Sequence, residues 1–294
     1  MKLSSTPRTI LVLGRVSNLP TVWSNVLVGW FLAGGAWNLE LVWLLLGMSL
    51  VYVAGMTLND AFDAKWDREH GTDRPIPRGD ISEAIVWVIG AAQLVVGVEI
   101  LLGLTSVDVR LAALLVLAVL LYNWLHKLHA ASVLLMGACR ALVYLGAASA
   151  VAAHTEALMV PPLVWLVVGG VVLYIAGLTL AARNEHLASP GNVAALPRLL
   201  LMLPVLFPLF SFRYVPSTPL TYALAAAGVL GVWSWLFLTR KALREKIPLG
   251  IARGIAGIAC FDAATVVFAD WRAAVLCLVF FVLALGAQRV IPAT

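Results

Sequence analysis

The chain has 294 residues, of which 62% are apolar and 12% charged, with a formal net charge of +5 and a mean hydropathy of +0.96. Soluble globular proteins are about 45–50% apolar and about 25% charged, so this composition excludes an ordinary soluble enzyme, a disordered chain and a disulfide scaffold. The basic residues gather at the ends of apolar runs. Their placement indicates membrane topology and not nucleic-acid binding, so we expect an integral membrane protein.

Ten segments are long and apolar enough to cross a bilayer, which requires about 20 residues of helix. In chain order they are 18–35, 39–60, 83–104, 109–125, 130–152, 161–182, 194–212, 219–239, 249–269 and 271–289. The seventh is interrupted by Pro197, Pro204 and Pro208, so its helical continuity is open. The sequence therefore predicts an all-α integral membrane protein, a bundle of nine to ten transmembrane helices. We expect one domain over 1–294, with 1–17 as a cytoplasmic N-terminal segment.

The positive-inside rule predicts the orientation. If both termini are cytoplasmic, the basic residues between the spans that lie on the opposite side are only Arg110, Arg213 and Arg272. The two longest polar connections, 60–82 and 183–192, then lie on the cytoplasmic side. We therefore expect a multi-pass protein of a bacterial inner membrane, with both termini and the mouth of the active site in the cytoplasm.

The end of the second span carries a cluster of oxygen-bearing side chains: Asn59, Asp60, Asp63 and Asp67. At about 100° per residue, all four share one narrow face of a helix. Carboxylates this close repel one another, and a hard cation such as Mg²⁺ relieves the repulsion while bridging to substrate phosphates. The sequence therefore predicts a Mg²⁺ site here. In the alternative interpretation, these acids only solvate a helix end and pair with neighbouring basic residues.

The spacing Asn59-Asp60-x-x-Asp63-x-x-x-Asp67 resembles the first aspartate-rich motif of the UbiA superfamily of intramembrane prenyltransferases. The following segment 74–79, Arg-Pro-Ile-Pro-Arg-Gly, resembles the segment that follows this motif in the family. Segment 121–127 resembles the end of the family's fourth helix, which presents a tyrosine and a diphosphate-binding lysine, and 15–25 resembles its first helix. The resemblance covers about the first 270 residues and indicates a divergent branch of the superfamily.

The resemblance implies a bundle with a central apolar cavity that opens at the cytoplasmic side. It also implies Mg²⁺-dependent transfer of an isoprenyl group from an isoprenyl diphosphate donor to a hydrophobic aromatic or lipid acceptor, by ionisation of the allylic diphosphate among membrane lipids. The implied catalytic residues are Asp63, Asp67 and Lys127. The implied diphosphate-binding residues are Asn59, Arg74, Arg78, Tyr122, Asn123, Lys127 and Arg183. The implied metal ligands are Asn59, Asp60, Asp63, Asp67, Asn184 and Glu185.

The second aspartate-rich motif of the family is depleted in this chain. Its place at the end of the sixth span holds one carboxylate, Glu185, beside Asn184 and Arg183. Either Glu185 and Asn184 bind a second ion, or Arg183 supplies part of its charge at the diphosphate, or catalysis has been lost. A non-catalytic isoprenoid-binding protein and a secondary transporter therefore stay open as alternative functions.

Two ionisable residues lie inside predicted spans. A bare guanidinium near the middle of a span costs at least about 2.5–3.5 kcal/mol, so Arg140 must face a partner or a polar cavity. A structural ion pair with Asp262 or Glu99 and a role in the substrate cavity are equally consistent with the sequence. Asp262 has the same two interpretations.

Overall fold

The computed structural model describes residues 7–127, 132–154, 160–183, 195–202 and 218–293. All the regular structure in these residues is helical, which confirms the all-α prediction. The helices are α1 (Pro7–Leu13), η1 (Val16–Asn18), α2 (Leu19–Leu32), α3 (Leu39–Glu69), α4 (Pro75–Arg78), α5 (Glu83–Leu104), α6 (Val109–Leu125), α7 (Ser132–Ala152), α8 (Pro162–Arg183), α9 (Ala195–Met202), α11 (Pro219–Glu245), α12 (Ile247–Val266) and α13 (Trp271–Ala287).

Six of these helices are long and apolar enough to cross a membrane: α3, α5, α7, α8, α11 and α12. Two further apolar helices, α6 and α13, have 17 residues each. The chain is therefore an integral multi-pass membrane protein. The count of nine to ten spans stays a prediction, because most of the predicted seventh span lies outside the described residues. The single domain over 1–294 also stays a prediction.

Helix α3 is longer than its predicted span, which was expected to end at residue 60. It continues without a break to Glu69, and the turn after it contains Gly71 with a positive φ of 61°. Hydropathy falls after Leu58, but helix propagation depends on backbone hydrogen bonding and on the absence of glycine and proline. The acidic residues are therefore held on a continuous rigid helix.

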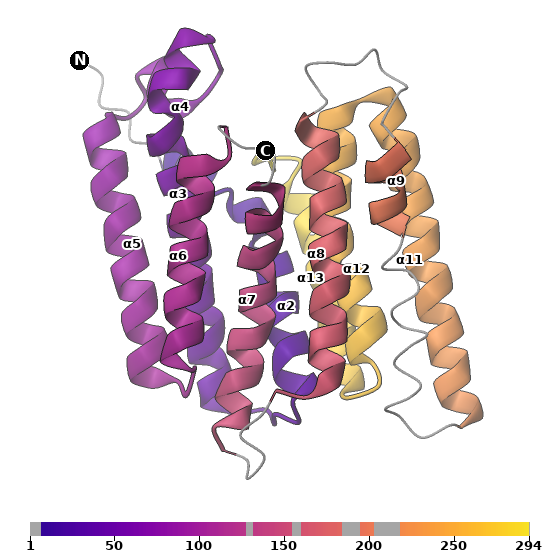
Figure 1. The fold of residues 1–294 in the computed structure, drawn as a ribbon. Helices are drawn as coiled ribbons and strands as arrows, with labels where there is room; N and C mark the ends of the chain where they lie inside the picture. The colour runs from indigo at the N-terminus through magenta and orange to yellow at the C-terminus, as the bar shows by residue number, and fades with distance from the viewer. Residues whose placement is uncertain (1–6, 128–131, 155–159, 184–194, 203–217, 294) are drawn as a thin grey trace.

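The helices form a bundle in which α2 lies against α3, α7, α12 and α13. Helix α5 packs on α3 and forms one outer edge, whereas α11 packs on α12 and forms the opposite edge (Figure 1). Only 22% of the apolar window of α5 and 17% of that of α11 is buried, against 72% for α12. The outer helices therefore present their apolar side chains to lipid.

The bundle brings the two ends of the described chain together. Asn18 donates a hydrogen bond of 2.9 Å to the carbonyl oxygen of Ala293 and accepts one of 3.2 Å from Gln288. The short helix α4 lies at the end of the bundle where α3 ends (Figure 1). The start of α2, the end of α3 and the residues after α13 therefore form one polar end of the molecule.

The crossing of α2 and α7 depends on a glycine. A Cβ atom built on Gly29 would lie 2.2 Å from the carbonyl oxygen of Tyr144, which no side chain tolerates. This close approach lets Asn25, one turn earlier on α2, reach the hydroxyl of Tyr144. The glycine thus sets the distance between two helices that share a buried polar network.

We predict that Gly29→Ala destabilises the protein by about 2 kcal/mol, because overpacking of a close helix crossing typically costs about 1–3 kcal/mol. Gly231→Ala is the matched control, since a Cβ atom there meets nothing within 4 Å. Unfolding in detergent, followed by circular dichroism, measures both variants. Equal stability of the two variants would contradict the role of Gly29.

Candidate functional site

The end of α3 has one asparagine and three aspartates inside and its aromatic side chains outside, beside the exposed Lys65, Arg68 and Glu69. Asn59, Asp60, Asp63 and Asp67 are all buried, whereas the aromatic side chains of Phe62 and Trp66 are exposed. The exposed aromatic side chains fit a helix that leaves the membrane at the lipid interface. The buried carboxylates require compensation by cations or by hydrogen-bond donors.

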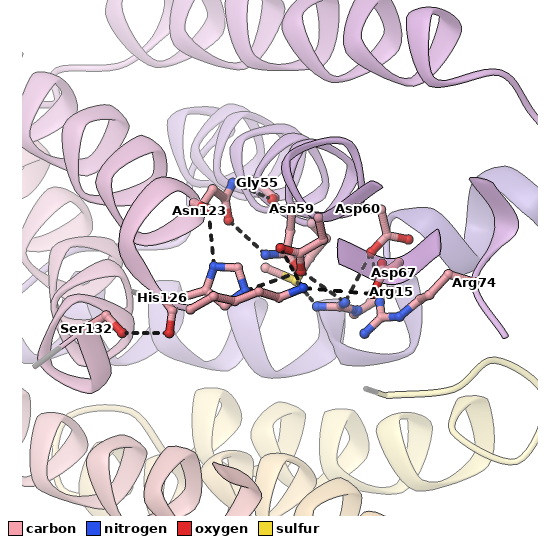
Figure 2. Close-up of polar contacts among 12 residues, drawn as sticks. Arg15, Gly55, Asn59, Asp60, Asp67, Arg74, Asn123, His126 and Ser132 are labelled. Carbon is pink, nitrogen blue, oxygen red and sulfur yellow. Dashed lines mark hydrogen bonds and ion pairs between the residues drawn. The ribbon is translucent and has the colours of Figure 1, made fainter. Parts of the chain in front are cut away.

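Asp60 is compensated by two arginines that come from other segments. Its Oδ1 atom lies 2.8 Å from Arg74, just before α4, and 3.3 Å from Arg15, before η1 (Figure 2). Burial lowers the pKa of the Arg74 guanidinium, and so does the nearby charge of Arg15, while Asp60 raises it. Asp60 therefore holds two cations side by side at the polar end of the bundle.

Arg15 was not among the predicted site residues. Its guanidinium also donates to the Oδ1 atom of Asn59 at 3.2 Å and lies 3.3 Å from the sulfur of Met56. Its backbone has a φ of 42° and a ψ of 47°, the only positive φ of a non-glycine residue in the part of the chain that the structure describes. Such strain costs about 1–3 kcal/mol and is concentrated at functional sites. The only sign of Arg15 in the sequence was its place in segment 15–25, which resembles the first helix of the family.

Asp63 and Asp67 are compensated by the residues that follow α6. The ammonium of Lys127 lies 3.0 Å from Asp63 Oδ1, 3.9 Å from Asp67 Oδ1 and 3.7 Å from the centre of the Trp66 ring. The Nε2 atom of His126 lies 3.3 Å from Asp63 Oδ2. The lysine thus lies between the two carboxylates, and His126 is a second neighbour that sequence reasoning missed.

Asn123 connects this site to the interior of the bundle. It accepts a hydrogen bond of 3.3 Å from Asn59 and donates one of 3.0 Å to the carbonyl oxygen of Gly55 (Figure 2). The ring of Tyr122 stacks on that of His126, with centroids 5.2 Å apart. The end of α6 therefore meets the end of α3 along a continuous line of polar side chains.

The remaining predicted residues are not all at this site. Arg78 lies on the surface and pairs with Asp73 and Asp80, away from the buried carboxylates. Asn184 and Glu185 lie outside the described residues, and the side chain of Arg183 does too. The composition of the second motif therefore stays a prediction.

An apolar cavity begins directly beneath the polar site. It lies between α2, α3, α6 and α7, and its lining includes Tyr122 and Asn123 at the polar end, Val51 and Val119 along its walls, and Arg140. The predicted apolar cavity is therefore present, and its opening at the cytoplasmic side stays a prediction. Because Asn123 lines the cavity and also binds Asn59, the carboxylates and the apolar interior share one boundary.

Arg140 and Asp262 do not form the direct ion pair that was one interpretation of the sequence. Arg140 donates to the side-chain oxygen of Asn25 at 2.9 Å, and the amide nitrogen of Asn25 donates to Asp262 at 2.8 Å. Ser24 and Tyr144 donate to Asp262 as well, each at 2.5 Å. The two charges are thus joined through the amide of Asn25.

The donor set at the end of α3 fits a hard divalent cation. Asn59, Asp63 and Asp67 offer carboxylate and amide oxygens, the ligands that Mg²⁺ prefers. Among the residues that the structure describes, no three acidic, histidine or cysteine side chains are grouped closely enough to bind a metal as they stand. The Lys127 ammonium already bridges Asp63 and Asp67, so a metal there requires the lysine to move away.

The fold and the site together define an intramembrane protein that combines a buried acidic cluster with an apolar cavity. The family is shown by sequence: a model of the UbiA prenyltransferase family matches residues 20–191, and the chain belongs to that family. Prenyltransferases of this family generally depend on Mg²⁺.

Solved structures show the same fold. The chain is similar to the apo structure of a UbiA homologue from Aeropyrum pernix K1, with a TM-score of 0.69 and 19% identity over 87% of this chain and 98% of that one. It is also similar to a structure described as that of digeranylgeranylglyceryl phosphate synthase in membranes, with a TM-score of 0.61 and 17% identity over 89% of this chain and 97% of that one. At these identities the likeness establishes the fold alone.

Curated relatives match over a shorter stretch. Digeranylgeranylglyceryl phosphate synthases from Methanopyrus kandleri and Natronomonas pharaonis are each 30% identical to the chain, over 120 and 121 residues. In both cases the match covers 41% of this chain and 44% of the relative. The chain thus matches less than half the length of these relatives.

We predict that Asp60→Asn lowers the free energy of unfolding by about 2 kcal/mol, because it leaves Arg15 and Arg74 without their shared counter-ion in a mostly buried setting. Asp73→Asn removes an exposed ion pair with Arg78 and is expected to cost no more than about 0.5 kcal/mol. Denaturant unfolding in mixed micelles measures both. A cost for Asp60→Asn as small as that of Asp73→Asn would show that the shared ion pairs of Asp60 with Arg15 and Arg74 do not stabilise the fold.

Proposed function

We propose that this protein transfers an isoprenyl group from an isoprenyl diphosphate donor to an aromatic or lipid acceptor within the membrane, by ionisation of the allylic diphosphate. The observation that carries the proposal is that the buried carboxylates and Lys127 adjoin an apolar cavity through Asn123, which lines the cavity and binds Asn59. An isoprenyl diphosphate has the same division, a polyanionic head on an apolar tail. Family membership supports the reaction class.

In this proposal Asn59, Asp63 and Asp67 hold Mg²⁺, and Asn184 and Glu185 are proposed for a second ion. Mg²⁺, when bound, supplies positive charge that stabilises the diphosphate as the allylic C–O bond breaks. Asp60 has a different role, because its Oδ1 atom already accepts from Arg15 and Arg74. It positions these two guanidinium groups beside the metal-binding side chains.

The cations of the site hold the leaving diphosphate. Lys127 exchanges its contacts with Asp63 and Asp67 for contacts with phosphate oxygens, and Arg74 and Arg15 donate from the opposite side. The two arginines, which Asp60 fixes before the reaction starts, stabilise the charge that develops on the leaving group. Tyr122 and Asn123 lie at the boundary with the cavity, and Arg78 and Arg183 are proposed as outer cations that attract the donor.

The cavity determines the fate of the allylic cation. Its walls, which include Met48, Val51, Leu115 and Val119, are apolar and hold the isoprenyl tail. An apolar cavity also excludes water, which would otherwise capture the cation. The acceptor nucleophile then forms the new bond to the allylic carbon, and the proton that it loses passes to the released diphosphate.

The acceptor is proposed only by class. The curated relatives are named for a glyceryl phosphate lipid product, which supports a lipid hydroxyl as one acceptor. A ring carbon of an aromatic acceptor is the other. A non-catalytic isoprenoid-binding protein and a secondary transporter are the alternatives, and membership in a prenyltransferase family favours the enzyme over both.

We predict that Asp63→Asn reduces Mg²⁺-dependent turnover at least 100-fold, because it removes a metal ligand and a counter-ion of Lys127 while preserving side-chain size. Glu69→Gln is the matched control, an exposed carboxylate on the same helix, and should retain wild-type turnover. The assay follows label from geranylgeranyl diphosphate into product, using purified protein, an extract of lipids and aromatic compounds, and either Mg²⁺ or a chelator.

Two results would contradict the proposal. Undiminished turnover of Asp63→Asn would show that the Asp63 carboxylate is not needed for the reaction. Saturable binding of geranylgeranyl diphosphate by the wild-type protein, without product or release of diphosphate, would identify a binding protein.

We also propose that the protein lies in the inner membrane of a bacterial cell and that its site opens to the cytoplasm. The prediction is that Asp73→Cys reacts with a membrane-impermeant maleimide only in inverted vesicles, and Arg110→Cys only in right-side-out vesicles. Both side chains are highly exposed, at opposite ends of the bundle. The native cysteines are replaced first. The reverse labelling pattern would invert the proposed orientation.

A further inference from the structure

Helix α11 ends in a group of cations that the proposed reaction does not use. Its last turns and the residue that follows them carry four exposed basic side chains: Arg240, Lys241, Arg244 and Lys246. Glu245 is the only acidic residue between positions 219 and 246. This end of α11 lies at the same end of the bundle as α4 (Figure 1). The outer helix therefore finishes in a strongly positive segment.

These four cations are not neutralised within the part of the chain that the structure describes. Several other exposed arginines lie beside a carboxylate: Arg68 beside Glu83, Arg110 beside Asp108 and Arg272 beside Asp270. By contrast, no described residue forms an ion pair with any of the four basic residues at the end of α11. Basic residues next to the end of a membrane helix attract negative charge from outside the chain.

Three of the cations share a face of α11 with an apolar stretch of the same helix. At about 100° per residue, six exposed side chains fall within about 100° of one another: Leu230, Trp233, Phe237, Arg240, Lys241 and Arg244. We call these six residues the α11 stripe. The rings of Trp233 and Phe237 stack, with centroids 6.2 Å apart and planes at 27°. Val232, Leu236 and Leu243 lie on the other side of the helix, where they are buried.

The order of side chains along the α11 stripe matches a phospholipid at the edge of a bilayer. Leu230 and Phe237 are seven residues apart, so the apolar part covers about 10 Å of helix and suits an acyl chain. Its aromatic rings suit the membrane interface, and Arg240 follows one turn further out. Arg240 and Arg244 are four residues apart, with Cβ atoms about 5–6 Å from each other, so both guanidinium groups can reach one phosphate.

We propose that the α11 stripe is a binding site for an anionic phospholipid. The lipid phosphate contacts Arg240, Lys241 and Arg244, and an acyl chain lies along the apolar part of the stripe. Charge complementarity favours this occupant over a second copy of the chain, because a two-fold contact through the stripe places the same cations against one another. The inference does not depend on the reaction at the end of α3.

Native mass spectrometry measures this binding directly. Purified protein in detergent is incubated with dioleoyl phosphatidylglycerol or with the same amount of dioleoyl phosphatidylcholine, which differ in headgroup charge and not in their acyl chains. We expect the wild-type protein to retain at least about fivefold more of the anionic lipid. In Arg240→Gln/Lys241→Gln/Arg244→Gln the ratio should fall to within about twofold of one, because the charges that select the headgroup are gone.

A second triple variant separates a site from the overall charge of the protein. Arg8→Gln/Lys65→Gln/Arg68→Gln is the matched control, since it removes the same number of positive charges from exposed positions on other helices. It should keep the wild-type ratio. An equal fall in the two triple variants would mean that the stripe contributes only to net charge and membrane topology, and would overturn the proposal. A wild-type ratio near one would overturn it as well.

A photo-crosslinker locates the lipid even if the triple variants do not fold. p-Benzoylphenylalanine replaces Phe237 in the stripe or, as a control, Leu220, which is exposed at the other end of the same helix. In vesicles with equal amounts of the two lipids, the probe at position 237 should form at least about threefold more adduct with phosphatidylglycerol, whereas the probe at position 220 should show no preference.

Two results of this experiment would contradict the lipid site. The first is equal adducts with both lipids at position 237. The second, with the same probe in native membranes, is a cross-link to a second copy of the chain or to another protein in place of a lipid.

Discussion

The structure depends on the burial of carboxylates at the end of an otherwise apolar helix. Asp60, Asp63 and Asp67 point inward from α3, and each requires positive charge nearby. The compensating groups come from the segment before α2, the segment before α4 and the end of α6. Charge neutralisation therefore ties together parts of the chain that lipid-facing apolar contacts alone would not hold in one arrangement.

The cations of the site are of two kinds. Arg15 and Arg74 are bound to Asp60. An aspartate that pairs with two arginines is poorly suited to bind a metal as well. Lys127 instead bridges the two carboxylates that have the spacing of metal ligands. The two arginines are held in place by Asp60. In the proposed function a metal would displace Lys127 from the two carboxylates, and Lys127 would then bind the diphosphate. A site that is neutral without ligand stays stable while keeping its charges ready for a polyanion.

A second polar layer lies deeper, where hydrogen bonds join Arg140 to Asn25 and Asn25 to Asp262. The layer is built across helices that approach closely because α2 has Gly29 at its crossing with α7. The apolar cavity extends between the two layers, because Asn123, which binds Asn59 of the outer layer, and Arg140 of the deeper layer both line it. The strained backbone of Arg15 belongs to the outer layer, where a precise position of charge compensates for its cost.

The sequence by itself determined the helices and the acidic face, because hydropathy and helical periodicity are local. The predicted spans 83–104 and 109–125 agree with α5 and α6, which begin after the N-cap residues Ser82 and Asp108. Only the tertiary structure decided which charges meet. Arg15 binds Asp60, which lies 45 positions away in the sequence, and Asn25 binds Asp262, which lies 237 positions away. Arg78 was predicted to bind the diphosphate, but it lies on the surface and pairs with Asp73, only five residues away. Such partnerships depend on helix packing and on the distance set by residues such as Gly29, and no local pattern encodes them.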